Sequence, residues 1–110
     1  MAYDEALAAR IRDRIGARPD LTEKTMFGGL AFLVGGNLAV AASGQGGILV
    51  RVDPAESDAL VSATPAEPME MRGRAMRGWL RVDGAGVRTK RQLETWVRRG
   101  VGYAKTLPPK

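Results

Sequence analysis

Residues 25–44 read TMFGGLAFLVGGNLAVAASG, a stretch without a charged side chain in a chain whose residues are 26% charged. Two glycine pairs, Gly28-Gly29 and Gly35-Gly36, interrupt its apolar residues. These turn residues arrive well before the roughly 18 consecutive apolar residues that a membrane-spanning helix needs. The stretch therefore predicts a meander of short strands and no membrane segment.

The same glycines do not form a phosphate-binding loop. Neither Gly28-Gly29 nor the segment 44–47 continues into the spacing of a Walker or dinucleotide-binding motif. Gly35-Gly36-Asn37 instead supplies the positive φ angles that a tight hairpin requires. Around these turns we expect strands at residues 23–27, 29–34 and 38–42.

Helices and further strands are predicted on both sides of the meander. Apolar residues at every fourth position predict a helix over residues 4–15. A fourth strand at 47–52 leads into Asp53-Pro54, which begins a short helix ending near Val61. After this helix we expect a loop, an edge strand at 69–71, a strand at 76–82, a flexible connection at 83–86, and a longest helix that begins at Thr89 with Gln92 in a capping box. The sequence thus predicts one domain over residues 1–110, of the α+β class, in the order helix, strands, helix, strands, helix.

The amino-acid composition excludes most catalytic mechanisms. The chain has no cysteine and no histidine, which excludes disulfides, thiolate or imidazole metal sites, and nucleophiles that depend on histidine. The carboxylates are scattered without motif spacing, and Asp53 is explained as a helix cap. We expect no enzyme, no cofactor and no metal, and a cytoplasmic location without a targeting segment.

Alternation along the strands divides the predicted sheet into two faces. One face is the predicted core: Leu30, Phe32, Val34, Leu38, Val40, Ile48, Val50, Val52, Leu80 and Val82. The other face carries Phe27, Gly29, Ala31, Leu33, Ala39, Ala41, Leu49, Arg51, Arg77, Trp79 and Arg81. This second face is too apolar for open water yet contains three arginines and two aromatic residues, so an interaction surface is expected there.

Three uses of the second face compete: a protein partner or a second copy, a covering by the same chain, and stacking on nucleic-acid bases. We favour them in that order, because a net charge of +5 gives only weak, salt-sensitive attraction to nucleic acid. Gly100 or Gly102 in the last helix is expected to allow close approach to a strand or to a neighbouring subunit. The candidate interaction residues are Phe27, Arg51, Arg74, Arg77, Trp79 and Arg81.

A cluster of arginines between residues 72 and 81 allows two interpretations. Clustered guanidinium groups can bind a phosphate or another small anion. Alternatively, nearby carboxylates pair with them across the edge of the sheet, and we favour this second interpretation. The arginines are Arg72, Arg74, Arg77 and Arg81, and the carboxylates are Glu67, Glu70 and Asp83.

Five segments resemble the amino-terminal domain of the TfoX family, named for the bacterial competence regulator also called Sxy. They are MAYDEALAARIRD, TEKTMFGGLAFLVGGN, LVRVDPAE, GRAMRGWLRV and YAKTLPPK, in this order along the chain. The resemblance implies a two-layer domain, similar to the folds grouped with secretion chaperones, in which helices pack on an antiparallel sheet. It brings no catalytic residues.

The resemblance also implies a regulatory module. In the competence regulators a carboxy-terminal domain follows this one, and we expect it to be absent here. The leading expectation is a small non-enzymatic binding or regulatory module that acts through a protein partner or a dimer. The alternative is a protein that binds a small anion, or an enzyme, with a site at residues 72–81.

Overall fold

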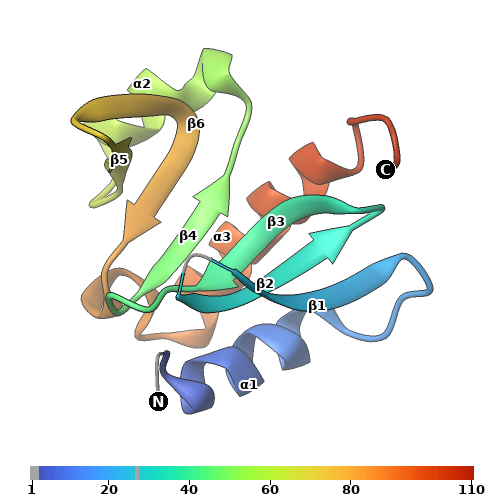
Figure 1. Ribbon diagram of the computed structural model, residues 1–110. Helices are drawn as coiled ribbons and strands as arrows, with labels where there is room; N and C mark the ends of the chain where they lie inside the picture. The colour runs from blue at the N-terminus through green and yellow to red at the C-terminus, as the bar shows by residue number, and fades with distance from the viewer. Residues whose placement is uncertain (1–2, 27) are drawn as a thin grey trace.

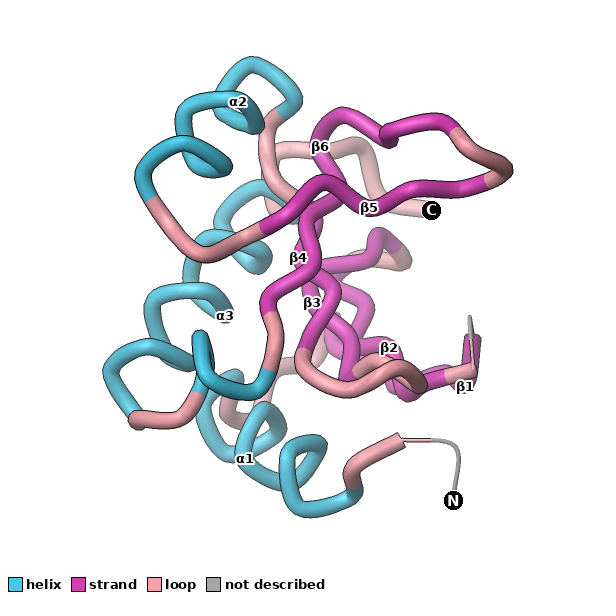
Figure 2. The backbone as a smooth tube through the Cα atoms, turned by 90° about the vertical axis from the view of Figure 1, so that its left-hand side faces the viewer, coloured by secondary structure: helices cyan, strands magenta, loops and turns pink. Residues whose placement is uncertain are grey.

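The structure, a computed structural model, describes residues 3–26 and 28–110. One six-stranded antiparallel sheet carries helices on one side (Figures 1 and 2). The helices are α1 (Glu5–Ile15), α2 (Pro54–Ala63) and α3 (Lys90–Ala104). The strands are β1 (Leu21–Met26), β2 (Gly29–Val34), β3 (Asn37–Ala42), β4 (Ile48–Arg51), β5 (Glu67–Met71) and β6 (Arg74–Val82), in the sheet order β1-β2-β3-β4-β6-β5. The predicted α+β class and element order are confirmed. Among the described residues, no helix combines the length and the apolar character that crossing a bilayer would require.

Side-chain caps begin all three helices, and the two at Asp53 and Thr89 are the predicted ones. Asp4 accepts a hydrogen bond from the backbone N–H of Leu7 at 3.1 Å, and Asp53 accepts one from Ala55 at 2.9 Å. Thr89 and Gln92 form a reciprocal capping box at the start of α3. Such caps satisfy backbone donors that the first helical turn leaves unpaired.

The connection after β6 differs from its prediction. Instead of a flexible segment, residues Gly84–Val87 form a short 3-10 helix, η1. The carboxylate of Asp83 caps it by accepting a hydrogen bond from the N–H of Gly86 at 3.1 Å. Val87, the last residue of η1, is buried in the main core, so this turn closes one end of the core.

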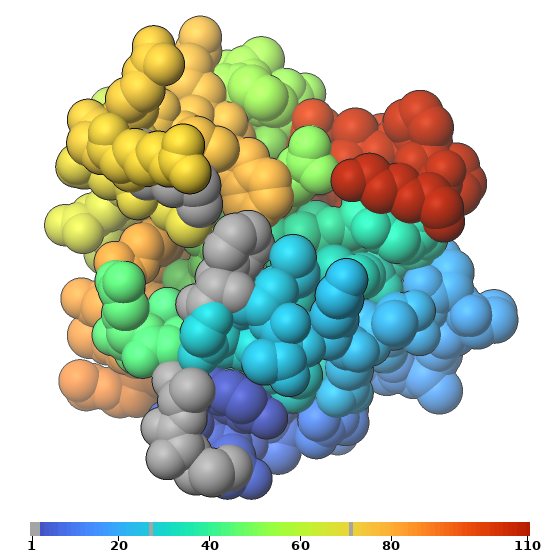
Figure 3. Space-filling model, in the orientation of Figure 1, coloured from blue at the N-terminus to red at the C-terminus, as the bar shows by residue number. Residues whose placement is uncertain are grey.

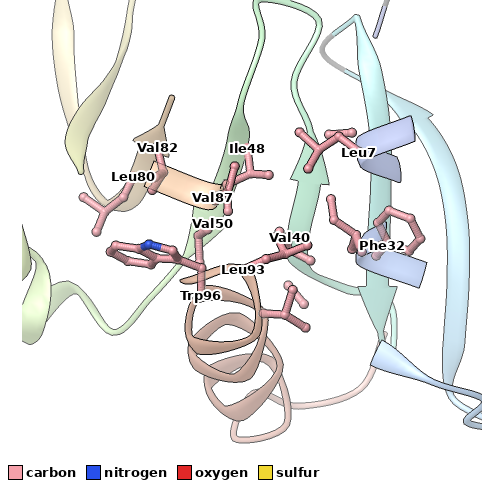
Figure 4. Packing of buried hydrophobic residues seen from close by; sticks show 14 of the residues in the cluster. Leu7, Phe32, Val40, Ile48, Val50, Leu80, Val82, Val87, Leu93 and Trp96 are labelled. Atoms are coloured by element: carbon pink, nitrogen blue, oxygen red, sulfur yellow. The ribbon is translucent and has the colours of Figure 1, made fainter. Parts of the chain in front are cut away.

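The main core lies between the sheet and helices α1 and α3 (Figure 4). Phe32 of β2, Ile11 of α1 and Leu93 of α3 are fully buried in it. The two helices contact each other as well as the sheet. Burial of large apolar side chains of this kind is the main favourable term in folding.

Because of a β-bulge in β3, the predicted core position of Leu38 is wrong. Phe32 pairs with Val40, but Leu33 pairs with Leu38, so Ala39 is an extra residue on its strand. An extra residue shifts the alternation: Ala39 joins the main core, and Leu38 lies on the opposite face with Ala41 and Leu49.

Gly100 of α3 lies directly on this bulge. A Cβ atom at this position would collide with the carbonyl oxygen of Ala39, whereas one at Gly102 would meet nothing within 4 Å. The predicted close approach of a helix glycine to a strand is therefore confirmed for Gly100.

The turn between β2 and β3 holds the carboxyl-terminal tail. Gly35 and Gly36 have φ angles of 60° and 85°, as the hairpin prediction requires. The backbone N–H of Lys110 donates to the Gly35 carbonyl at 2.8 Å, and the buried Asn37 side chain donates to the Pro108 carbonyl at 3.0 Å. These bonds fix the tail beside the sheet.

Candidate interaction surface

The sheet face that the helices do not cover is concave. The β1–β2 hairpin and the β5–β6 hairpin both turn away from the helices at the two edges of the sheet (Figure 2). In the view of Figure 3, β1 in blue, the β5–β6 hairpin in yellow and the carboxyl-terminal tail in red surround this face. We call it the concave face and define it by Met26, Ala31, Leu33, Leu38, Ala41, Leu49, Arg51, Met69, Trp79 and Arg81.

The floor of the concave face is apolar and the rim is half-buried. Ala31, Leu38, Ala41 and Leu49 are at most 5% exposed, although no helix in the described part of the chain covers them. The side chains of the rim are larger and remain partly accessible: Met26, Leu33, Met69 and Trp79. The face is thus partly covered by its own chain, and an accessible apolar rim remains.

A bend in β6 shapes one wall of the concave face. Gly78 has a φ of 86°, and its N–H donates to the Oγ of Ser57 in α2 at 3.3 Å. The pairing of β5 with β6 shifts register between Pro68 and Met69. Because the hairpin turns at this point, Met69 packs against the floor of the concave face.

Arg51 lies near two aromatic rings. Its guanidinium carbon is 5.0 Å from the ring centroid of Trp79 and 5.8 Å from that of Tyr103. Within the described residues, no carboxylate lies within 4.0 Å of Arg51. Stacking holds a planar guanidinium in place and leaves its N–H edges available to a further acceptor.

Arg51 and Arg81 occupy diagonal positions on the concave face. Arg51 pairs with Trp79 across strands β4 and β6, and Leu49 pairs with Arg81 one repeat further along. The two arginines and the two apolar residues therefore alternate in a block of four. Beside this block lies a hollow of about 70 Å³, lined by Met26, Ala41, Leu49, Met69 and Arg81 among others.

The favoured carboxylate pairing of the arginine cluster is wrong. Among the described residues, only Arg77 of the cluster has a carboxylate within 4.0 Å, and that partner is Asp58 of α2 at 3.7 Å. Arg72 and Arg74 are exposed near the tip of the β5–β6 hairpin. Arg81 lies at the other end of this hairpin, where its backbone is opposite that of Glu67 in the strand register. The four guanidinium groups therefore do not converge on one small ligand.

Arg77 differs from its predicted placement on the second face. It donates a hydrogen bond to the carbonyl of Pro54 at 3.4 Å and contacts Asp58, both in α2. The bend at Gly78 interrupts the strand alternation on which the prediction rested. Phe27, another candidate residue, lies outside the described residues.

Arginines near α1 have close acidic partners, in contrast to Arg51. Arg12 binds Glu23 of β1 at 2.7 Å and Arg18 binds Asp20 at 2.8 Å. The hydrogen bond from Arg12 lowers the pKa of Glu23, and the one from Arg18 lowers the pKa of Asp20. These carboxylates are therefore engaged in ion pairs with neighbouring arginines.

No convergent set of reactive groups occurs in the described part of the chain. Glu23 pairs with Arg12 and Asp53 caps α2, so neither meets Arg51 in a cleft. Across residues 3–26 and 28–110, no three acidic side chains gather where they could hold a metal ion.

The comparison with protein families agrees with this architecture. The model of the TfoX N-terminal domain matches residues 13–104, most of the 110-residue chain. The chain belongs to the TfoX N-terminal domain family. No curated protein and no solved structure matches it. Membership supports a regulatory type of module, and the family is not a known enzyme family.

In this TfoX N-terminal domain, four residues at the concave face are not among those predicted for it: Met26 and Met69 of the rim, Leu38 of the floor, and Tyr103. Tyr103 comes from the end of α3, 52 positions beyond Arg51 in the chain, and no local pattern brings the two together. Simple strand alternation predicts Leu38 in the core, because a bulge leaves no trace in that pattern. Arg51, Trp79 and Arg81 are on the face predicted for them.

Proposed function

We propose that this TfoX N-terminal domain is a non-enzymatic regulatory module of the cytoplasm that binds a protein through its concave face. One observation carries the proposal: an apolar sheet face without a covering helix, with an accessible rim of Met26, Leu33, Met69 and Trp79. Accessible apolar patches with polar neighbours are typical of protein interaction sites. The occupant is another protein or a second copy of the chain.

The make-up of the rim supports a protein occupant. Methionine side chains are flexible and polarizable, and they adapt to partner surfaces. Tryptophan and arginine are the residue types most enriched among the energetically dominant positions of protein interfaces. Trp79 and Arg51 lie beside each other on this face.

Affinity purification with matched variants tests the proposal. Leu33→Glu places a charge on the rim, whereas Arg98→Gln changes an exposed arginine of α3 on the opposite side of the sheet. We expect wild type and Arg98→Gln to recover the same stoichiometric protein, or to self-associate, and Leu33→Glu to lose it. Denaturation midpoints establish that both variants fold. Equal recovery by both variants would contradict the proposal.

A further inference from the structure

We infer that the partner presents an acidic, amphipathic segment, in which two carboxylates bind Arg51 and Arg81 and a large apolar side chain lies on Leu49 and Trp79. The inference rests on the proposed function of the concave face and specifies its chemistry. It follows from a difference among the arginines: Arg12 and Arg18 near α1 have acidic partners within 4.0 Å, whereas Arg51 and Arg81 have none among the described residues.

Arg51 is arranged in advance for a carboxylate. Trp79 and Tyr103 hold its guanidinium group at 5.0 Å and 5.8 Å from their ring centroids. None of the hydrogen bonds within the described residues uses this guanidinium, and no carboxylate there lies within 4.0 Å of it. A planar guanidinium binds a carboxylate through two parallel N–H bonds, and a stacked one loses little side-chain entropy in doing so.

The spacing of the two arginines fits a peptide segment. The Cα atoms of diagonal neighbours on adjacent antiparallel strands are about 7–8 Å apart. Arg51 and Arg81 are diagonal neighbours in the β4–β6 register. Residues i and i+2 of an extended segment are about 6.8 Å apart, and residues i and i+4 of a helix about 6 Å. Two carboxylates on either form of a peptide therefore match the backbone spacing of the two arginines.

Apolar contacts complete the match. Leu49 and Trp79 occupy the other diagonal of the same block, with Met69 beside them. The hollow next to Leu49 and Arg81, about 70 Å³, is large enough for only part of a side chain. A segment with acidic residues alone would leave this apolar surface uncovered, so the segment is amphipathic.

Two glutamates favour isolated carboxylates over a polyphosphate chain. Glu67 pairs in register with Arg81, and Glu70 lines the same hollow as Arg81. A nucleic-acid backbone carries a phosphate at every nucleotide and would bring further negative charge against these glutamates. A peptide can place its two carboxylates at the arginines and neutral residues elsewhere.

The test uses dodecapeptides selected from a random phage-displayed library on the wild-type protein. We expect enriched peptides to carry two carboxylates at i, i+2 or i, i+4 together with a large apolar residue. Arg51→Gln or Arg81→Gln should raise the dissociation constant of such a peptide about 10- to 100-fold, which is the effect of losing a charge-assisted hydrogen bond. Arg51→Lys keeps the charge without the planar fork and should restore binding only in part. Arg98→Gln should bind as wild type.

A site-specific signal separates failure of the inference from failure of the proposed function. The chain has two tryptophans: Trp79 on the concave face, and Trp96 of α3, which is buried in the main core. Peptide binding should shift the NMR signal of the Trp79 indole N–H and leave that of Trp96 unchanged. Peptides that shift Trp79 but lack acidic residues, or that bind Arg51→Gln as tightly as wild type, overturn the inference and leave the concave face as a binding site.

Two other outcomes would contradict the protein-binding role of the concave face as well as the acidic segment. Peptides that bind without shifting the Trp79 signal contradict the proposed function itself. Submicromolar binding of a single-stranded oligothymidylate at physiological salt, lost in Arg51→Gln and Arg81→Gln, would replace the acidic peptide with nucleic acid.

Discussion

Gly100 and Gly102 lie two residues apart in α3, yet the structure gives them opposite roles. Gly100 lets the helix lie on the bulge of β3, where a Cβ would collide with the Ala39 carbonyl oxygen and lie 3.3 Å from a methyl carbon of Val50. Gly102 is exposed and has nothing within 4 Å of that position. Only one of the two glycines is therefore needed for packing.

Alanine substitutions at these two positions should change stability in opposite directions. Gly100→Ala gains helix propensity but must displace a strand, and we expect a net loss of about 1–3 kcal/mol. Gly102→Ala gains about 0.5–1 kcal/mol, because alanine is the better helix former and restricts the unfolded chain. Urea denaturation midpoints give the order. A Gly100→Ala variant as stable as Gly102→Ala would contradict the close contact between α3 and β3.

At the scale of elements, one hydrogen bond links α2 to the bend in β6. The Ser57 hydroxyl, in a residue 3% exposed, accepts from the N–H of Gly78 at 3.3 Å. There is no space for a side chain at Gly78, since a Cβ there would lie 2.9 Å from the Val52 carbonyl oxygen. The bend that forms a wall of the concave face therefore depends on both residues.

Ser57→Ala should leave the buried N–H of Gly78 without its acceptor. We expect a loss of about 1–2 kcal/mol and faster hydrogen exchange at Gly78 than in wild type. Ser62→Ala, an exposed position of the same helix, serves as the control and should leave that exchange rate unchanged. If Ser57→Ala protects Gly78 as well as wild type does, the hydroxyl is not what holds the bend.

The ion pair of Arg12 and Glu23 joins α1 to β1 and predicts a pH dependence. Its hydrogen bond lowers the pKa of Glu23 below the ordinary value of 4.5. A carboxyl group with a lowered pKa stabilises the fold above its ordinary pKa, and this stabilisation is lost as the pH falls through the folded value. Glu23→Gln removes the titrating group while the lowered pKa of Asp20 remains.

We therefore expect the urea midpoint of wild type to fall more than that of Glu23→Gln between about pH 7 and about pH 3. The difference should develop below about pH 4.5, the ordinary pKa of the group. Parallel pH profiles for the two proteins would show that the pair does not stabilise the fold.

Local signals predicted most elements, whereas contacts between distant residues could not be predicted. The caps Asp53 and Thr89 and the turn at Gly35-Gly36 depend on a few neighbouring residues, so the sequence displays them directly. The bulge at Ala39 depends on α3, which needs Gly100 against it. In the same way, Arg51, Trp79 and Tyr103 meet only because the sheet and the end of α3 converge.

At the scale of the whole molecule, self-association stays a prediction, and the structure narrows its surface. Gly100 is occupied by the strand of its own chain, which leaves the concave face as the expected contact. Two-fold symmetry brings the same patch of both copies together, so arginines of one copy face those of the other. Like charges repel, and salt screens them.

Sedimentation at micromolar concentrations should therefore reveal a dimer that becomes tighter as salt is raised and that dissociates when an acidic amphipathic peptide occupies the same face. Leu33→Glu should be monomeric under the same conditions, with Arg98→Gln as the control. A monomer at every salt concentration would exclude a second copy and leave a different protein as the occupant.

The most direct test of the account is photo-crosslinking at two positions in living cells. A benzophenone amino acid replaces Met69 on the rim of the concave face or, as the control, Arg98 on the exposed side of α3. We expect one discrete adduct with a protein other than a second copy of the chain from position 69, absent when Arg51 is also changed to Gln, and none of the same mass from position 98. An adduct that forms equally from both positions, or only from position 98, would contradict the concave face as the binding surface.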